Sequence, residues 1–413
     1  MAAPRLALYT GAAVTVRMAD EGARIALILL AFDRIGAGGP TGLLVACLMV
    51  PHVVAAPVVG AMTDRSRRPP VLIGVLALGF GAALAVTAGT LGRLPLAVPV
   101  LVLLAGGACG PALTGALSSQ VARLTSAERL PRAFGVDGLT YNVAGIVGPA
   151  LAGVVGGAVG PAAACLLMAG LAAAGGTLAA TLPGRGAPVE TLRGRGAPTA
   201  TPPGRGAPTA TVHGRGPRPG YGAGIRAIVA DRTLLIVVVA STVGQLGPGA
   251  VPVVVAFAAE AAGDAAAAGL MLAAVAAGGL VGSLLWTARP APAARAPSVL
   301  MVAMCGAGLP LLVGAFTTAL PVLAGALVVS GLFSGPLIGA LFTARSVLSP
   351  EGVRAQVFTI AAGLKVTAAA TGTAVVGLLA DWPLPVLFLL VGLNPVVTGA
   401  VGLLALRVSP RGP

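Results

Sequence analysis

The chain has 413 residues, of which 57% are hydrophobic and only 9% are charged. Its mean hydropathy of +0.97 excludes a soluble globular protein, because a soluble chain of this length needs far more polar surface to cover its core. The net charge of +14 does not indicate a nucleic-acid partner, since aromatic residues make up only 3% of the chain and the basic residues fall in short gaps between apolar segments.

Apolar segments of about twenty residues recur along the sequence, and that is the length an α-helix needs to cross a hydrocarbon core about 30 Å thick. We therefore predict an all-α polytopic membrane protein with twelve transmembrane helices. They are expected at residues 7–32, 41–62, 71–91, 96–118, 134–157, 160–182, 233–258, 266–287, 298–317, 319–342, 358–380 and 384–406. Six fall in residues 1–182 and six in residues 225–413, which predicts two six-helix bundles joined by residues 183–224.

The arginines predict the orientation, because positively charged residues are retained on the cytoplasmic side of a membrane. With the N-terminus in the cytoplasm, the outer loops hold only Arg34 and Arg93. Of the 26 Lys and Arg residues, one is lysine and two arginines lie inside the first predicted span, so 21 arginines remain for the cytoplasmic segments. These include Arg345, in the segment after the tenth span. The bias predicts that both termini and residues 183–224 face the cytoplasm, in a multi-pass protein of the cell (inner) membrane.

The first predicted span carries a cluster of charges in the sequence VRMADEGAR. Its members are Arg17, Asp20, Glu21 and Arg24. Their spacing of i, i+3, i+4 and i+7 places them on one stripe of a helix, with Asp20 near the middle of the span. Charges at that depth are costly unless they are paired or hydrated, and by default they mark an ion or substrate pathway. We expect the stripe to line such a pathway and to exchange protons. The alternative is a structural cluster in which two acids and two arginines neutralise each other.

The loop after the second predicted span reads GAMTDRSRRPP. Gly60 allows two helices to approach closely, and Asp64 can cap a helix N-terminus or pair with an arginine across an interface. Arg65 and Arg68 favour the cytoplasmic surface. The pattern Gly60-x-x-x-Asp64-Arg65-x-x-Arg68 resembles the signature loop between helices 2 and 3 of the major facilitator superfamily. The resemblance implies the major facilitator fold and a role for this loop in latching the cytoplasmic gate.

The loop departs from the family pattern in two places. Arg67 stands where a glycine is usual between the arginines, and Pro69 stands where a basic residue is common. The equivalent loop of the second half begins at Gly282, where Trp286 occupies the Asp position and only Arg289 remains basic. Such decay is common in the second half of this superfamily, so it does not contradict the resemblance.

The fifth predicted span contains the sequence GIVGPALAG, from Gly145 to Gly153. It resembles the glycine-proline motif of antiporters in the superfamily, which usually ends in two glycines where this chain has Ala-Gly. Gly148 favours close helix packing, and Pro149 bends a helix by freeing a backbone carbonyl. The resemblance favours export. Ordinary packing of small residues is the alternative interpretation.

Residues 183–224 contain a ten-residue repeat in which GRGAP begins at Gly184, Gly194 and Gly204. A segment rich in Gly, Pro, Thr and Arg buries too little apolar surface to offset the entropy of ordering, so we predict a disordered linker. Contact of its arginines with anionic lipid or nucleic acid is the alternative. The following sequence, GIRAIVADRTL, predicts a short amphipathic helix at the membrane interface.

Four polar residues of the later spans are expected to contact a substrate if the family geometry holds. They are Asp137, Tyr141, Asn142 and Gln245. Lys365, the only lysine, can extend to the interface or pair with Asp64 or Asp137. His52, beside Pro51, is expected to be a packing residue.

No metal or cofactor is expected. The four cysteines each lie in an apolar segment without a CxxC motif, and the chain has only two histidines. No nucleotide-binding motif occurs, so ATP is not expected to act directly. The expected partners are a small-molecule substrate, protons and the lipid bilayer, and the expected state is a monomer.

The resemblance implies a secondary transporter, similar to actinobacterial drug or metabolite exporters of the superfamily. We expect proton-coupled efflux of a small amphipathic molecule by alternating access. The alternative in the same class is a proton symporter or facilitator that imports a small solute. A remote alternative is an intramembrane enzyme, for which the LFSG sequence at Ser334 lacks a neighbouring catalytic signature. We therefore expect a transporter and no enzyme.

Overall fold

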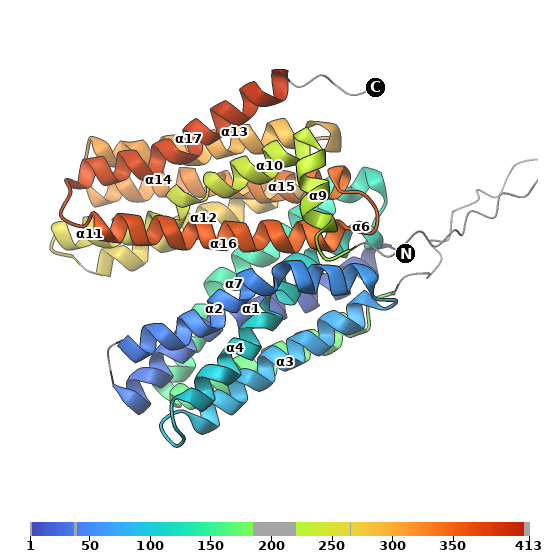
Figure 1. Ribbon diagram of the computed structural model, residues 1–413. Coiled ribbons are helices and arrows are strands. Elements are labelled where there is room, and N and C mark those ends of the chain that lie inside the picture. Colours follow the sequence, from blue (N-terminus) through green and yellow to red (C-terminus); the bar gives the residue numbers. More distant parts are fainter. Residues whose placement is uncertain (1, 37–38, 185–219, 265, 409–413) are drawn as a thin grey trace, which may run out of the picture.

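Figure 1 shows a computed structural model of the chain, which describes residues 2–36, 39–184, 220–264 and 266–408. Within these ranges every regular element is a helix. A membrane-embedded chain requires this, because the hydrocarbon core offers no water to satisfy backbone N–H and C=O groups. Nearly all of the segment expected to be a disordered linker, at 185–219, lies outside the described residues.

The elements before the central segment form one group, called here the N-terminal group. Its long helices are α1 (Ala2–Ile35), α2 (Gly39–Arg65), α3 (Pro69–Thr90), α4 (Ala97–Pro111), α7 (Leu130–Ala158) and α8 (Pro161–Ala180). Short helical segments join α4 to α7, namely η1 (Ala112–Ala116), α5 (Leu117–Ser119), α6 (Val121–Leu124) and η2 (Ala127–Arg129). The helix α1 packs along α7 and α8, while α3 lies between α8 and α4.

The elements after the central segment form a second group, called the C-terminal group. They are α9 (Ala223–Ala230), α10 (Arg232–Val243), α11 (Leu246–Ala261), α12 (Ala266–Ala288), η3 (Ala293–Arg295), α13 (Ala296–Gly308), η4 (Leu309–Ala315), α14 (Leu320–Leu332), α15 (Ser334–Leu348), α16 (Arg354–Leu378) and α17 (Leu384–Val408). The pairs α12–α14, α13–α17 and α11–α16 pack most extensively within it.

Among the described residues, eleven helical segments are long and apolar enough to cross a membrane. They are 43–65, 69–90, 97–124, 127–158, 161–180, 232–261, 267–288, 293–315, 320–348, 354–378 and 384–408. Each overlaps one of the last eleven predicted spans. The first predicted span lies inside α1, which has 34 residues but is not among the eleven, because the charged stripe lowers its apolar character.

The α1–α7 contact depends on glycines that bring the two backbones together. A Cβ added at Gly148 would lie 2.6 Å from the carbonyl oxygen of Met18, and one at Gly22 would lie 2.8 Å from the carbonyl oxygen of Gly148. The other glycines of the predicted helix-5 motif, Gly145 and Gly153, have nothing within 4 Å of such a Cβ. Of these three glycines, only Gly148 is therefore required for close packing.

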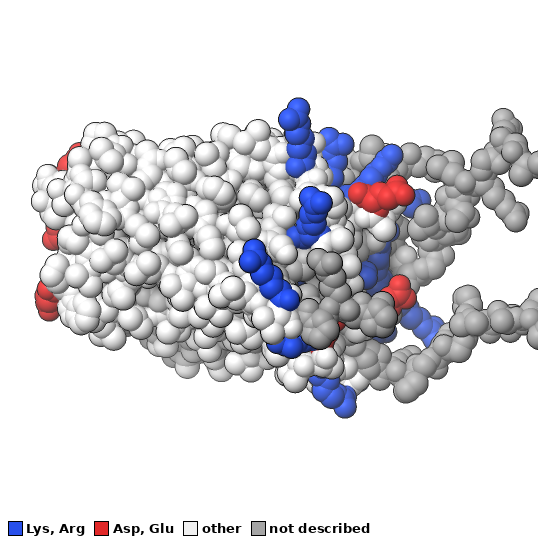
Figure 2. All heavy atoms as spheres, turned by 90° about the horizontal axis from the view of Figure 1, so that it is seen from above, with Lys and Arg blue, Asp and Glu red and all other residues white. Residues whose placement is uncertain are grey.

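The two groups lie against each other at the end of the molecule where α6 and α9 lie, and they diverge toward the opposite end (Figure 1). We call the first the α9 end. On the face shown in Figure 2, Lys and Arg gather at the α9 end, whereas the coloured side chains at the opposite end are acidic.

The short helix expected after the central segment is present as α9. Its Ile228 is 6% exposed and packs with Val357 and Ile360 of α16. The backbone N–H of Gly224 donates a hydrogen bond of 2.9 Å to Oε1 of Gln356. These contacts fasten α9 across the first turn of α16.

Candidate functional site

Two neighbouring cavities lie between the N-terminal and C-terminal groups. The smaller has a volume of about 200 Å³ and the larger about 490 Å³. The polar residues that line the smaller cavity are Asp20, Glu21, Arg24, His52, Thr114, Tyr141, Arg345 and Lys365. Tyr141, Ile338 and Lys365 line both cavities, so the two are adjacent. A central cavity between two helical groups is therefore the main candidate site.

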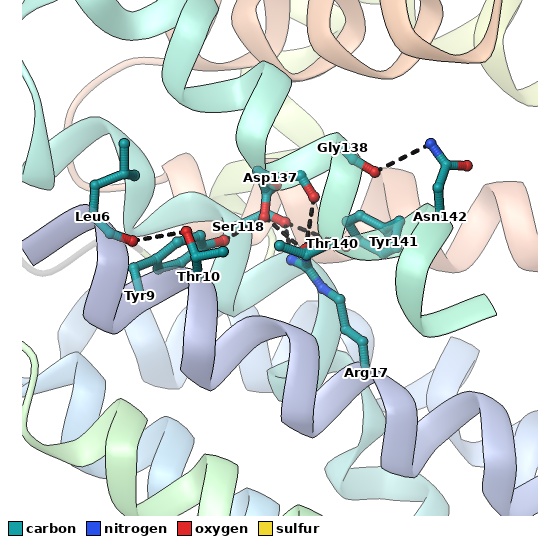
Figure 3. Close-up of polar contacts among 10 residues, drawn as sticks. All are labelled: Leu6, Tyr9, Thr10, Arg17, Ser118, Asp137, Gly138, Thr140, Tyr141 and Asn142. Atoms are coloured by element: carbon teal, nitrogen blue, oxygen red, sulfur yellow. Dashed lines mark hydrogen bonds and ion pairs between the residues drawn. The ribbon is translucent and has the colours of Figure 1, made fainter. Parts of the chain in front are cut away.

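The side chain of Arg17 points toward Asp137 and Thr140 of α7 (Figure 3). Its Nη1 lies 2.7 Å from Oδ1 of Asp137, and its Nη2 donates a hydrogen bond of 2.8 Å to Oγ of Ser118. Nη1 also donates to Oγ1 of Thr140. Both members of the ion pair are essentially inaccessible, at 1% and 0% exposure.

This network corrects two expectations from the sequence. Asp137 was expected to contact substrate and Arg17 to line the cavity, but neither lines either cavity. Tyr9 donates a further hydrogen bond to Oδ1 of Asp137, and the ring of Tyr141 lies 3.6 Å from Cζ of Arg17. The physical reason is that the two charges compensate each other inside the N-terminal group, where Tyr9, Ser118 and Thr140 supply most of their hydrogen bonds.

The remaining stripe residues lie on the cavity wall formed by α1. Arg24 contacts both acids, with Nη1 2.8 Å from Oε2 of Glu21 and Nη2 3.6 Å from Oδ2 of Asp20. The side chain of Asp20 is 10% exposed, whereas those of Glu21 and Arg24 are each 33% exposed. Since Arg17 is committed to Asp137, the stripe does not neutralise itself: two carboxylates share one arginine.

The opposite wall carries two cations that sequence reasoning placed differently. Arg345 was counted in a cytoplasmic segment, but α15 continues to Leu348 and holds Arg345 at 1% exposure on the cavity. Lys365 was expected to extend to the interface or to pair with Asp64 or Asp137. Instead it lines both cavities and makes no ion pair within the described part of the chain.

His52 lies on the smaller cavity as a packed residue. The residue is only 8% exposed, and its Nε2 is 3.5 Å from Oγ1 of Thr114. A Cβ added at Gly110 would overlap Nδ1 of its ring. This close fit agrees with the packing role expected from the sequence.

Aromatic rings from both groups form a cluster next to the smaller cavity. Phe134 of α7 lies 5.9 Å from Phe358 of α16 and 6.0 Å from Phe342 of α15, measured between ring centroids. Tyr141 lies 5.6 Å from Phe342 and joins this cluster to the cavity wall. Tyr141 and Phe342 line the smaller cavity, whereas Phe134 and Phe358 are fully buried.

Asp64 binds the first turn of α16, across the boundary between the groups. Its Oδ1 accepts a hydrogen bond of 3.0 Å from the backbone N–H of Ala355, and its Oδ2 accepts one of 2.9 Å from Gln356. A carboxylate at a helix N-terminus satisfies free N–H groups and is stabilised by the helix dipole. Gly60 permits the approach, because a Cβ there would lie 2.6 Å from Cα of Gln356.

A second contact between the groups joins α7 to α12. Nδ2 of Asn142 donates a hydrogen bond of 2.7 Å to Oγ of Ser283, and Nε of Arg132 donates one of 2.9 Å to the carbonyl oxygen of Thr287. Asn142 and Gln245 both line the larger cavity, as expected for residues that meet a substrate. Nothing else tests that expectation, which remains a prediction.

No group of three or more His, Cys, Asp or Glu residues in the described ranges is arranged to hold a metal ion. Each described cysteine is free, and Cys47 and Cys165 are buried among apolar side chains. The chemistry of the site therefore lies in charges and hydrogen bonds that surround a cavity.

The described helices include segments that can cross a membrane, and a cavity with charged residues lies between the two helical groups. This architecture is typical of a multi-pass membrane transporter. The chain belongs to the Major Facilitator Superfamily, whose family model matches residues 10–289. It is accordingly a transporter and not an enzyme.

One protein of known function is similar in sequence to part of the chain. Over 119 residues the chain is 33% identical to the tetracycline resistance protein, class C, of Escherichia coli. The match covers 28% of this chain and 28% of that protein. The chain thus corresponds to well under two thirds of the relative's length, and this likeness does not define a substrate.

Solved structures share the fold over nearly the whole chain. A bacterial homologue of the iron transporter ferroportin, in an outward-facing state, has a TM-score of 0.70 at 16% identity and covers 96% of this chain and 99% of its own. The fucose:proton symporter of E. coli has a TM-score of 0.69 at 15% identity and covers 98% of both chains. A proton:xylose symporter has a TM-score of 0.66 at 12% identity, with 99% and 97% covered. At these identities the likeness establishes the fold alone.

Proposed function

We propose that this transporter exports a small amphipathic molecule in exchange for protons by alternating access. The observation that carries the proposal is the position of Asp20 and Glu21, two carboxylates that line the cavity between the two groups. They share Arg24 as their cation, and the opposite wall of the cavity carries Arg345 and Lys365. Groups that bind and release protons belong at such a place if protons and substrate are to use one pathway.

The chemistry of coupling follows from opposing influences on the two carboxylates. Arg24 favours their charged form, whereas loss of water favours their neutral form. A conformational change that hydrates or dries the cavity shifts that balance. Protons taken up while the cavity faces one side are then released at the other, and the substrate moves in the alternate step.

We further propose that α1 is the twelfth span and that residues 1–182 and 225–413 form two six-helix bundles joined by residues 183–224. Both termini then lie on the cytoplasmic side of the inner cell membrane. The gathering of Lys and Arg at the α9 end in Figure 2 supports this orientation, because basic residues are retained in the cytoplasm. The cavity is formed within one chain, which supports a monomer as the working unit.

The described contacts support an arrangement that is closed at the cytoplasmic end. Asp64 on the first turn of α16, Asn142 on Ser283 and the aromatic cluster all join the groups at or toward the α9 end. In this orientation the cavity is shielded from the cytoplasm. Breaking these contacts and closing the opposite end gives the alternate state.

Efflux is supported by the relative with 33% identity, which is a tetracycline resistance protein. The glycine-proline sequence on α7 supports the same direction through its resemblance to the antiporter motif. Proton symport is the second candidate, because two of the structural neighbours are proton symporters for fucose and xylose.

The direction of a driving pH gradient separates the two candidates. Purified protein is reconstituted into vesicles with either an acidic or an alkaline lumen, and uptake is measured for a panel of amphipathic compounds that begins with tetracycline. Exchange for protons predicts accumulation in vesicles with an acidic lumen, beyond that in protein-free vesicles with the same gradient. Accumulation only in vesicles with an alkaline lumen would establish symport instead.

A further inference from the structure

The two walls of the smaller cavity carry unequal charge. On the α1 side, Asp20 and Glu21 contribute two negative charges and Arg24 one positive charge. On the opposite side, Arg345 and Lys365 contribute two positive charges. With His52 neutral, three cations face two carboxylates, and one positive charge is left without compensation.

Arg345 is the more deeply buried of the two opposing cations. It is 1% exposed, and its one side-chain acceptor among the described residues is neutral, with Nη2 3.2 Å from Oγ of Ser241. Its Nε has no partner among the described residues. A buried guanidinium is costly unless its donors find acceptors. Here the donors of Arg345 are incompletely satisfied, which leaves room for an acceptor on a ligand. Guanidinium donors are fixed in a fork that fits a carboxylate with two parallel hydrogen bonds.

Lys365 extends the same positive surface. It projects from α16 onto both cavities and makes no ion pair with any described residue. An ammonium can direct any of its three donors at an anion without a fixed geometry. Its place on both cavities puts the positive surface at their junction.

The larger cavity supplies an apolar chamber beside these cations. Its lining includes Val251, Leu272, Val275, Leu311, Leu327 and Ile338. Its volume of about 490 Å³ lies in the range of pockets that hold small organic ligands. An apolar chamber next to unpaired cations fits a molecule with an apolar body and one anionic group.

We propose that the transported molecule is an amphipathic organic anion, whose acidic group binds between Arg345 and Lys365 and whose apolar body occupies the larger cavity. The proposal rests on the export function proposed above and specifies its substrate class. One negative charge on the ligand compensates the one unmatched positive charge. Asp20 and Glu21 stay on the other wall, where they can exchange protons without losing Arg24.

The test compares three probes that share one apolar body and differ in charge. They are 1-naphthaleneacetate, the neutral 1-naphthaleneacetamide and the cationic 1-naphthylmethylamine. Calorimetric titration of the detergent-solubilised full-length protein measures the affinity of each. The acetate is expected to bind at least about tenfold more tightly than the acetamide or the amine. The reason is that Arg345 and Lys365 form stronger hydrogen bonds with a carboxylate than with a neutral amide.

Variants place this preference on the two cations. Arg345→Gln and Lys365→Gln should each weaken acetate binding by about tenfold and leave acetamide binding nearly unchanged. Arg345→Lys should retain part of the preference, since it retains the charge. Arg93→Gln, an exposed arginine at the opposite end, is the control for net charge. Size-exclusion profiles and melting temperatures identify any variant that has lost its fold, and the charge-retaining variant then carries the test.

Three results would overturn the proposal. The first is equal or tighter binding of the amine or the amide, and the second is an equal effect of each variant on all three probes. The third is no saturable binding of the acetate. These outcomes are separate from failure of proton exchange: selective acetate binding without transport driven by a pH gradient would reject the coupling and keep the anion site. Gradient-driven transport of tetracycline without any preference for the acetate would do the reverse.

Discussion

Arg17 and Asp137 place two full charges in the interior of the N-terminal group, where neither residue is more than 1% exposed. Tyr9, Thr140 and Ser118 form hydrogen bonds with the pair, whereas Nε of Arg17 and Oδ2 of Asp137 have no partner among the described residues. Removing one member of such a pair leaves the other charge buried without compensation. The pair is therefore expected to fix α1 against α7 rather than to bind ligand.

Asp137→Asn should destabilise the protein by about 3–5 kcal/mol, the usual effect of breaking a buried ion pair from one side. The measurement is the free energy of unfolding in detergent, followed by circular dichroism. Asp381→Asn, at an exposed position between α16 and α17, is the matched control and should be neutral. The double variant Arg17→Met, Asp137→Leu should recover much of the loss. A melting curve for Asp137→Asn that matches the control would show that the pair is not structural.

For single residues, the sequence predicts which side chains carry functional charges better than it predicts which residues those side chains contact. The i, i+3, i+4, i+7 spacing identifies the stripe on α1, and three of its members do line the cavity. The spacing cannot reveal that Arg17 binds Asp137, because that contact spans 120 residues and depends on how α1 and α7 pack. A short sequence pattern carries no information about that packing.

Asp64 joins two elements that belong to different groups. It holds two N–H groups in the first turn of α16, while Gly60 lets α2 approach the same turn. The sequence predicted that Asp64 could cap a helix, and the structure confirms a cap. The capped helix could not be chosen from the sequence, since α16 begins 290 residues later.

Asp64→Asn should weaken closure of the cytoplasmic end more than it weakens folding, because a neutral amide oxygen accepts one of the two hydrogen bonds and loses the interaction with the helix dipole. Asp231→Asn is the matched control: Asp231 caps α10 with a 2.7 Å hydrogen bond from Leu234, within one group. Transport rates and melting temperatures are measured for both variants. Asp64→Asn should slow transport with a melting temperature close to that of Asp231→Asn. Unchanged transport by Asp64→Asn would contradict a gating role.

Arg345 illustrates where element boundaries matter. The tenth span was predicted to end at residue 342, but α15 continues to Leu348, which converts an expected cytoplasmic arginine into a cavity residue. Hydropathy locates the apolar centre of a helix and falls at its first charges, so a charged last turn is missed. The same effect removes α1 from the apolar spans.

For the whole molecule, the number and order of helices follow from segment length, because a bilayer admits few other structures. The cavity cannot be predicted in this way, since hydropathy gives no information about which faces of the predicted segments meet. The orientation is a proposal that rests on arginine placement and on the charged α9 end in Figure 2.

Cysteine labelling in intact cells tests that orientation. Tyr221, before α9, and Trp382, between α16 and α17, are 53% and 51% exposed, so they form a pair of equal accessibility. In a background without the four native cysteines, a membrane-impermeant maleimide should label Trp382→Cys and leave Tyr221→Cys unlabelled until the cells are permeabilised. Labelling of Tyr221→Cys in intact cells would reverse the proposed orientation.

Transport driven by a pH gradient in variants of the α1 carboxylates tests the central claim most directly. Wild type, Asp20→Asn and Glu21→Gln are reconstituted into vesicles with an acidic lumen, and accumulation of a compound transported by the wild type is followed beside its binding to solubilised protein. At least one variant is expected to lose accumulation driven by the gradient and still bind the compound, because the neutral side chain can no longer exchange a proton. If both variants accumulate the compound like the wild type, with the same dependence on pH, then Asp20 and Glu21 do not couple transport to protons, which contradicts the proposed mechanism.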